Sequence, residues 1–242
     1  MGGEMAADWL DRWRHPDSDL TGELARRRYK RVAGYRENPD DIVEHLGIEE
    51  RMREGGYRDR PLLELIQNGA DAISKAGSEG RIEVVLTDQD LYVANTGSRF
   101  DDEGVRSLLQ SHISDKRDAQ IGRFGLGFKS VLSLSDRPRV FSRSISLEFS
   151  ARRSRERLVD DGLAEPGSPV PALRLAWEVD ASERLPQNAT LSRLGEWADS
   201  IVHLPLTEPG AADRLGEAMQ RFSPSFLLFT ECALELCFID AR

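Results

Sequence analysis

The strongest constraint on the fold is an amphipathic helix that the sequence predicts over residues 59–77, DRPLLELIQNGADAISKAG. Proline is typical of the first turn of a helix and glycine of the position after its end, and Pro61 and Gly77 stand at those places. The apolar residues recur at helical spacing: Leu62, Leu63, Leu65, Ile66, Ala70 and Ile73. Such a helix must bury its apolar face against a second layer of structure.

β-Rich runs follow this helix and supply that layer. RIEVVLTD and LYVANTG, separated by a polar Asp-Gln-Asp turn, indicate a hairpin. Later strand-like runs are RVFSR, SLEFSARR, ALRLAWEV and SIVHLPL, and the chain closes with a helix near AADRLGEAMQRF and a strand in CALELCFID. These elements predict an α+β fold, a two-layer α/β sandwich in which helices cover one face of a mixed, mostly antiparallel sheet.

Composition limits the classes of partner. The 242 residues are 39% hydrophobic, which suits one large domain or a domain with a helical arm. A net charge of −9 gives the surface no general attraction for nucleic acid or anionic membrane, so phosphate binding must be local. The chain lacks a membrane-length apolar run and a signal-peptide layout, which predicts a cytoplasmic location. Cys232 and Cys237 are expected to be buried core thiols.

The first 56 residues read as charged helices. They contain a basic cluster, formed by Arg26, Arg27, Arg28, Lys30 and Arg31. A solvated helix face is the favoured interpretation of this cluster, and a nucleic-acid site is the alternative.

Three polar residues of the predicted helix, Glu64, Asn68 and Asp71, are spaced i, i+4 and i+7 and therefore project from one face. Burying a carboxylate and an amide is costly unless they serve a metal, a water or polar partners. A carboxylate can accept a proton from water, and an amide oxygen is a hard ligand suited to Mg²⁺. The alternative is an exposed polar stripe beside the apolar one.

A glycine-rich segment, GRFGLGF at Gly122–Phe128, reads as a turn that opens a helix, with Lys129 next to it. Glycines let the main chain approach phosphate oxygens, and a helix N-terminus presents free N–H donors. The segment lacks the Gly-Lys-Ser or Gly-Lys-Thr of a P-loop, and the polar SHISDKRDAQ before it does not suit a dinucleotide fold. A structural turn is the alternative.

The order of three motifs, ELIQNGADA, then VANTGSRFD, then IGRFGLGFKSV, resembles the GHKL superfamily of gyrase, the ninety-kilodalton heat-shock chaperone, histidine kinases and MutL. The span Glu37–Ser142 is most similar to the sacsin-type branch and to bacterial proteins with a sacsin N-terminal ATP-binding-like domain. The resemblance implies a Bergerat fold, with ATP and Mg²⁺ as cofactors. It divides the chain into an N-terminal helical arm, 1–36, and an ATP-binding domain, 37–242.

The resemblance also implies roles for individual residues. Glu64 matches the general base that orients the attacking water, Asn68 the magnesium ligand, and Asp71 an acidic residue behind the nucleotide. Asn95 stands in place of the aspartate that accepts the adenine amino group, and Gly97 matches the glycine that lets the base approach. The phosphate-binding box corresponds to Gly122, Arg123, Phe124, Gly125, Leu126, Gly127, Phe128 and Lys129. Residues 101–120, with Lys116, match the ATP lid, and Ser200 matches a hydroxyl residue that contacts the base.

Two positions depart from the family pattern. Asn95 replaces a carboxylate, and because an amide can present an acceptor or a donor, both adenine and guanine remain open. Arg99 stands where many relatives have a second glycine, which can alter the lid hinge or add a positive charge near the phosphates.

The expected function is Mg²⁺-dependent ATP binding with slow ATP hydrolysis that drives lid closure in a larger protein. Many relatives complete their site with a lysine or arginine from a following domain, so the chain is interpreted as an excised domain with ATP/ADP and downstream domains or a partner subunit as partners. A nucleotide-dependent homodimer is possible by the same resemblance. The alternatives are a nucleotide-binding switch without hydrolysis, a histidine-kinase-like phosphotransferase and a nucleic-acid module.

Overall fold

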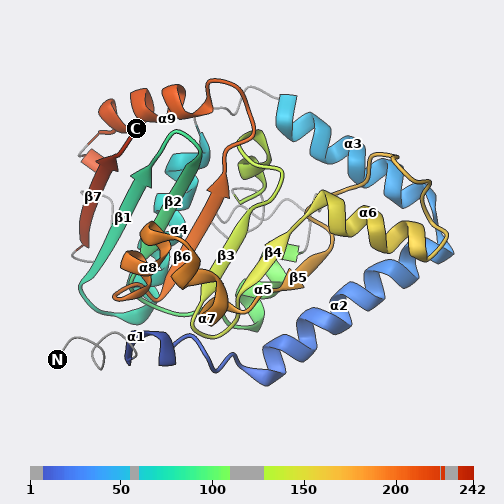
Figure 1. The fold of residues 1–242 in the computed structure, drawn as a ribbon, viewed down its shortest axis with the longest axis horizontal. Coiled ribbons are helices and arrows are strands. Elements are labelled where there is room, and N and C mark those ends of the chain that lie inside the picture. The colour runs from blue at the N-terminus through green and yellow to red at the C-terminus, as the bar shows by residue number, and fades with distance from the viewer. Residues whose placement is uncertain (1–7, 55–59, 110–127, 224, 227–233) are drawn as a thin grey trace.

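The computed structural model describes residues 8–54, 60–109, 128–223, 225–226 and 234–242 (Figure 1). Its centre is a seven-stranded open sheet in the order β5-β4-β3-β6-β2-β1-β7, in which the β1–β7 pair is parallel and the other pairs are antiparallel. The predicted α+β class and the mixed, mostly antiparallel sheet are therefore confirmed. The strands are β1 (Gly80–Leu86), β2 (Asp90–Asn95), β3 (Arg139–Ser142), β4 (Leu147–Phe149), β5 (Ala176–Glu178), β6 (Ser200–Pro205) and β7 (Leu234–Asp240).

Helices surround this sheet. Figure 1 shows α2, α3 and α6 gathered at the β4–β5 end and α9 near β7. The helices are α1 (Asp8–Asp11), α2 (Ser18–Glu37), α3 (Asp40–Glu54), α4 (Arg60–Ala76), α5 (Asp102–Leu109), α6 (Ala151–Asp160), α7 (Ala181–Arg184), α8 (Ala189–Gly195) and α9 (Ala211–Gln220), with 3₁₀ turns η1 (Phe128–Ser133) and η2 (Leu185–Gln187). The helices predicted before the hairpin and near residue 215 are present. The end of SLEFSARR, predicted as strand, belongs to α6.

Helix α4 packs on one face of the sheet and carries the largest core cluster. Its buried residues Leu65, Ile66 and Ile73 share this cluster with Ile82 and Val93 of the hairpin. A Cβ on Gly69 would lie 3.1 Å from the Ile82 side chain and 3.3 Å from the Asn95 side chain. Helix and hairpin therefore approach as closely as a glycine at position 69 allows.

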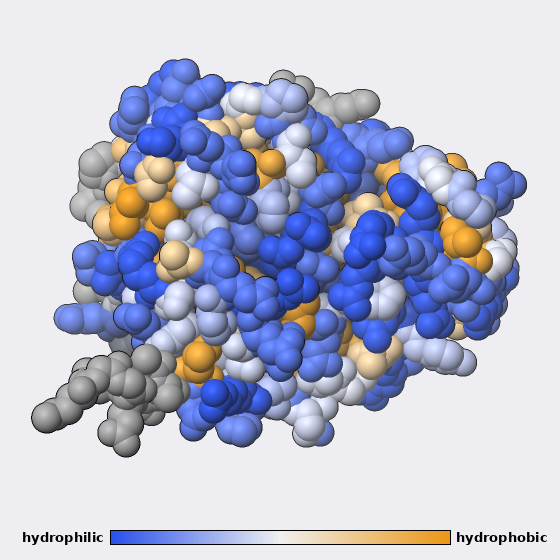
Figure 2. Space-filling model, in the orientation of Figure 1, coloured by the Kyte–Doolittle hydropathy of each residue, from blue (hydrophilic) through white to orange (hydrophobic). Residues whose placement is uncertain are grey.

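The opposite face of the sheet is covered as well, which corrects the prediction of helices on one face only. Tyr92, Ala94 and Ile201 point to this second face, where they form a core with α7, α8 and Trp13. The indole Nε1 of Trp13 donates to the Gly195 carbonyl at 3.0 Å. Because apolar residues occupy both alternating sets of strand positions, each face needs its own covering layer. The outer surface on this side is mostly hydrophilic, with small scattered apolar groups (Figure 2).

The N-terminal helices pack on the β5 end of the sheet. Val32 and Tyr35 of α2, with Ile42 of α3, form a third apolar cluster with Leu158 of α6. The proposed boundary between an arm, 1–36, and a domain, 37–242, remains a prediction, although α2 contacts both β5 and α5.

The structure bears on two predictions made from composition, the lack of a membrane-spanning segment and the burial of the cysteines. Within the described ranges, no helix combines the length and the apolar character that crossing a membrane requires. Cys237 is a free thiol on β7 and is half-buried rather than buried, and Cys232 lies outside the described residues.

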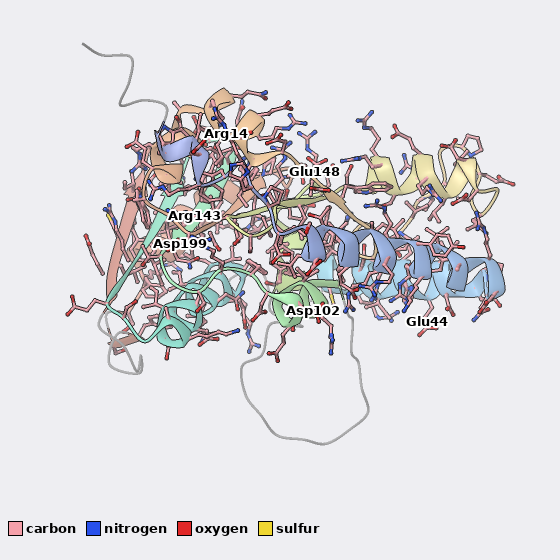
Figure 3. The ribbon with its side chains drawn as sticks, turned by 90° about the horizontal axis from the view of Figure 1, so that it is seen from below. Arg14, Glu44, Asp102, Arg143, Glu148 and Asp199 are labelled. Carbon is pink, nitrogen blue, oxygen red and sulfur yellow. The ribbon has the colours of Figure 1, made fainter. Side chains whose placement is uncertain are left out.

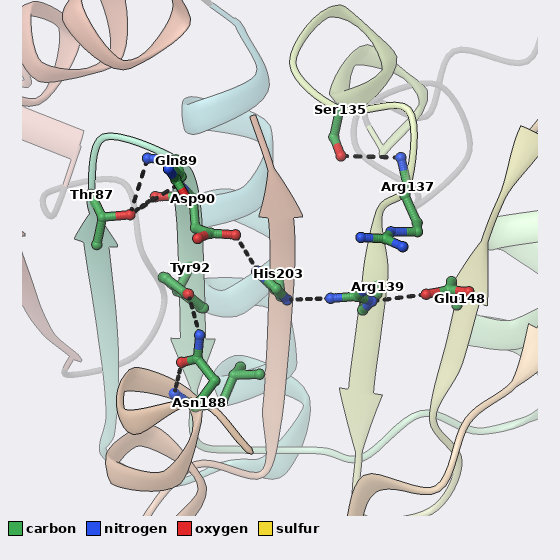
Figure 4. A network of polar contacts seen from close by, with 11 residues as sticks. Thr87, Gln89, Asp90, Tyr92, Ser135, Arg137, Arg139, Glu148, Asn188 and His203 are labelled. Atoms are coloured by element: carbon green, nitrogen blue, oxygen red, sulfur yellow. Dashed lines mark hydrogen bonds and ion pairs between the residues drawn. The ribbon is translucent and has the colours of Figure 1, made fainter. Parts of the chain in front are cut away.

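A polar row crosses the second face of the sheet (Figure 4). His203 Nε2 lies 2.7 Å from Asp90 Oδ1, and its Nδ1 lies 3.3 Å from Nη1 of Arg139, which also donates through Nε to Glu148 at 2.9 Å. The ring of Tyr92 stacks on the imidazole with centroids 4.6 Å apart. Because a guanidinium only donates, Nδ1 accepts and Nε2 carries the proton toward Asp90, so His203 is neutral.

This row predicts an acid-sensitive contribution to stability. Burial lowers the pKa of His203 below 6.5, and the bond to Asp90 opposes part of this shift. The folded imidazole binds a proton less readily than the unfolded one, so its contribution is present above pH 6.5 and is lost as the pH falls below it. Urea unfolding at about pH 7.5 and about pH 5.5 should show a larger loss for wild type than for His203→Gln, by up to about 1.4 kcal/mol per pH unit. Equal losses in both proteins would contradict the neutral assignment.

Candidate functional site

A cavity of about 490 Å³ opens between α4, α5 and one end of β2 and β6. Its size falls within the roughly 300–1,000 Å³ of small-molecule sites. The described lining is Leu65, Asn68, Gly69, Asp71, Ala72, Ser74 and Lys75 of α4; Val93 and Asn95 of β2; Ser98, Arg99, Phe100 and Asp101 of the following turn; Glu103, Gly104, Ser107 and Leu108 of α5; and Phe128, Ser200 and Val202. Residues from at least four separate segments thus share one cavity.

Asn95 and Ser200 are paired across neighbouring strands at the inner end of this cavity. Both are buried, and the Asn95 amide donates from Nδ2 to the Thr96 carbonyl at 2.8 Å. Ser200 Oγ is buried and has no hydrogen-bond partner among the described residues. A buried hydroxyl without a partner is costly, so this atom is suited to receive a polar group of a ligand.

Helix α4 brings two of its three predicted polar residues to the cavity. Asn68 is half-buried and Asp71 is exposed, and both line the wall. Glu64 lies about one turn before Asn68 and is half-buried, but it is not among the described lining residues. The i, i+4, i+7 spacing therefore places the second and third residues at the cavity and the first beyond its described edge.

Gly97 acts at the junction between the β2 turn and α4. Its φ is +117°, and a Cβ would lie 2.6 Å from the Ala72 carbonyl oxygen, which also accepts the Ser98 N–H at 2.9 Å. The Gly97 N–H donates to Asp199 Oδ2 at 3.1 Å, and Asp199 pairs with Arg143 at 3.0 Å (Figure 3). The short distance to the α4 main chain is by itself sufficient reason for a glycine at position 97. Gly97 is not among the described lining residues, so its expected contact with a base stays a prediction.

An ion pair that the sequence did not indicate stands at the rim. Lys75 Nζ donates to Asp101 Oδ2 at 2.6 Å, and Oδ1 of Asp101 accepts the Gly104 N–H at 2.8 Å at the start of α5. The bond to Lys75 holds the pKa of Asp101 below its usual range, and the same bond raises the pKa of Lys75. An aspartate before an acidic helical turn is an N-cap signal, so Asp101 could have located the start of α5 in the sequence. The same signal does not indicate that Asp101 pairs with Lys75 of α4.

The glycine-rich motif reaches the cavity through its last residue. Phe128 is buried, lines the cavity and packs on Phe149 with ring centroids 5.8 Å apart. The predicted helix after the motif is a short 3₁₀ turn, η1. Lys116, Gly122, Arg123, Phe124, Gly125, Leu126, Gly127 and the Lys129 side chain lie outside the described residues.

The described lining combines apolar walls with a mixed rim. Apolar contact is available from Leu65, Val93, Phe100, Leu108, Phe128 and Val202. The charged lining residues are three carboxylates, Asp71, Asp101 and Glu103, and two cations, Lys75 and Arg99. Within the described part of the chain, no group of three or more His, Cys, Asp or Glu residues could hold a metal ion. Asn68 beside Asp71 offers oxygen ligands of the hard type that Mg²⁺ prefers.

Comparison with known proteins finds a partial similarity. No protein-family model matches the chain. The chain is similar to Protein NO VEIN of Arabidopsis thaliana, with 32% identity over 90 residues. These residues make up 36% of this chain and 3% of the plant protein, so the chain corresponds to a small part of that protein's length.

The junction at Gly97 can be tested by comparing two glycines of positive φ. Gly162 has φ +69°, and a Cβ there would meet nothing within 4 Å. We expect Gly162→Ala to lower the free energy of unfolding by about 1–2 kcal/mol for backbone conformation alone. Gly97→Ala should cost about 3 kcal/mol or more, because the added methyl also meets the α4 main chain. Urea unfolding measures the free energy of unfolding of both variants. Equal losses would show that the contact between the added methyl and Ala72 does not destabilise the fold.

Proposed function

We propose that this chain is a GHKL-type ATP-binding domain that binds Mg²⁺-ATP in the cavity beside α4 and hydrolyses it slowly, driving lid closure and a conformational change in a larger protein. One observation carries the proposal: Asn68 with Asp71, Asn95, Ser200 and Phe128, selected from four separate segments of the sequence, line one cavity. We expect a cytoplasmic protein with ATP/ADP and a downstream domain or partner subunit as partners, and with a possible nucleotide-dependent homodimer.

The inner end of the cavity suits an aromatic base. Because Nδ2 of Asn95 donates to the Thr96 carbonyl, the amide oxygen is left as the group that can accept a hydrogen bond from a ligand. The partnerless hydroxyl of Ser200 lies on the paired strand position and can donate or accept. Apolar side chains from α4, α5 and the sheet exclude water around them. Such a combination recognises a flat heterocycle with a polar edge.

The outer part of the cavity suits a divalent cation. Asn68 would hold Mg²⁺ through its side-chain oxygen, with the Asp71 carboxylate on the same cavity wall, and the ion when bound would neutralise charge on phosphate oxygens. Glu64 lies about one turn before Asn68 on α4, and we propose that this carboxylate orients a water and accepts its proton. Lys75 is held by Asp101, so Arg99 is the lining cation that we propose for contact with the phosphates. The roles of Lys116 and Lys129 rest on the sequence resemblance.

The alternative function is a nucleotide-binding switch without significant hydrolysis. The position of Glu64 supports this alternative, because its carboxylate is not among the described residues that line the cavity. In a switch, lid closure on bound ATP would be the whole effect, and Glu64 would have no role in turnover.

Nucleotide binding is tested by calorimetry with ATP and Mg²⁺. Asn68→Ala and Asn95→Ala should each weaken binding about ten-fold, the effect of losing one hydrogen bond or ligand to a charged or polar group. Gln67→Ala is the matched control, since Gln67 is the neighbouring amide on the exposed side of α4. It should change the affinity less than two-fold. Titration with GTP measures the preference set by Asn95, and a wild-type chain that binds neither nucleotide would refute the proposal.

Hydrolysis is tested by Glu64→Gln, which keeps the size of the side chain and removes the base. Phosphate release should fall about 100-fold or more while ATP affinity stays within two-fold. Glu79→Gln, a change of the same kind at an exposed position after α4, should leave the rate unaltered. If Glu64→Gln matches the wild-type rate, the assigned role is wrong. Tight binding without turnover in the wild type would support the switch.

A further inference from the structure

A second cavity, of about 300 Å³, lies beside α2 and has a strongly basic lining. Five of its eight described lining residues are cationic, and none is acidic. The chain as a whole carries a net charge of −9, so this concentration of positive charge runs against the composition. The lining is Leu24, Arg27, Arg28, Lys30, Arg31, Leu109, Arg174 and Ala176.

Arg174 is the most unusual member of this lining. It is only 4% exposed, yet its Nε and Nη1 have no hydrogen-bond partner among the described residues. The nearest carboxylate, Glu49, lies 3.9 Å from Nε. The oxygens of Glu49 already accept the N–H groups of Ala172 and Leu173 at 2.6 and 2.9 Å. A buried guanidinium with unused donors is costly, and an anion in the cavity would supply the missing acceptors.

The cations of α2 are held in place by neighbouring groups. Arg27 pairs with Glu23 at 2.6 Å and lies 3.6 Å from Asp102, which is labelled on α5 in Figure 3. Arg28 donates to the Ala176 carbonyl at 2.9 Å and lies over the Trp177 ring. These contacts fix the guanidinium groups before a ligand arrives, which lowers the entropic cost of binding.

Lys30 and Arg31 differ from the other lining cations of α2, because neither a carboxylate nor a carbonyl oxygen of the described residues holds their charged groups. Arg31 lies 6.0 Å from the centroid of the Tyr35 ring, and neither Lys30 nor Arg31 has an ion-pair partner among the described residues. Arg27 and Arg31 are one helical turn apart and face the same cavity. Planar guanidinium groups from two elements, α2 and the segment carrying Arg174, suit the several oxygens of a phosphate group.

We propose that this basic cavity is a binding site for the phosphate groups of a small ligand, with pyrophosphate as the simplest example. The volume is larger than one phosphate needs and is at the lower end of small-molecule pockets, roughly 300 Å³. A long nucleic acid is disfavoured, because the positive charge is confined to one pocket of an acidic chain rather than spread along a face.

This site is separate from the proposed ATP cavity. The two cavities share no described lining residue, and consecutive residues of α5, Leu108 and Leu109, line one each. The inference therefore does not rest on the proposed function. A phosphate-bearing ligand here would contact α2 and α5 together and would link the N-terminal helices to the wall of the first cavity.

Calorimetric titration of the whole chain with pyrophosphate, without Mg²⁺, tests the proposal. Arg31→Gln removes one cation of the lining, and Arg174→Lys keeps the charge but removes the planar fork. Each should weaken binding about ten-fold. Arg26→Gln is the matched control: the same charge change on the same helix, at a residue that is paired with Glu23 and does not line the cavity. Its affinity should stay within about two-fold of wild type. Thermal melting of each variant verifies that it folds.

Several results would overturn the proposal. The first is a wild-type chain that binds no pyrophosphate at about 10 mM, and the second is equal weakening by Arg26→Gln and Arg31→Gln. Loss of ATP binding in Arg31→Gln would assign the basic cavity to the nucleotide. A short RNA that binds more tightly than pyrophosphate and is equally sensitive to Arg26→Gln would indicate a nucleic-acid surface. Asn95→Ala changes only the lining of the first cavity, so it should retain pyrophosphate binding. Failure of the ATP proposal can therefore be told apart from failure of the pyrophosphate proposal.

Discussion

The close packing of α4 on the β1–β2 hairpin is the constraint on which the rest of the described structure depends. Two glycines permit it: a Cβ on Gly69 would lie 3.1 Å from Ile82, and one on Gly97 would lie 2.6 Å from the Ala72 carbonyl. At this separation the apolar face of α4 is sealed against the sheet, and the polar face next to it lies beside Asn95. A larger residue at either glycine would separate the helix from the strands and widen the cavity between them.

Each of the two cavities has in its lining a buried polar side chain with an atom that lacks a hydrogen-bond partner among the described residues. Ser200 Oγ marks the first cavity, and the guanidinium of Arg174 marks the second. Folded proteins satisfy nearly all such atoms, so an unsatisfied atom that also lines a cavity is a candidate ligand contact, whereas others, such as Ser154 Oγ and Trp177 Nε1, line neither cavity. The two lie in opposite electrostatic surroundings: carboxylates outnumber cations around the first, and cations alone charge the second. Helix α5 contributes to both walls, which gives the two proposed ligands a shared structural element.

Periodicity predicted the long elements and missed the short ones. Helix α4 and the β1–β2 hairpin follow their patterns, because each buries a regular set of apolar side chains. Helix α6 was missed because its apolar content is low, and it begins where Ser150 Oγ accepts the Arg153 N–H at 3.3 Å. Helices α7 and α8 are only 4 and 7 residues long, too short to show a helical period. Without them the second face of the sheet was predicted to be bare.

The sequence by itself determined the local elements, the polar stripe of α4 and the order of the three motifs. Only the tertiary structure decided which of these residues meet. The register of β2 with β6 pairs Asn95 with Ser200, and the docking of α5 brings Asp101 to Lys75 across 26 residues. At the basic cavity, Arg28 of α2 donates a hydrogen bond to the carbonyl of Ala176 in β5, which is 148 residues away in the sequence. Strand order and register depend on how all the apolar faces are buried together, and a single segment does not carry that information.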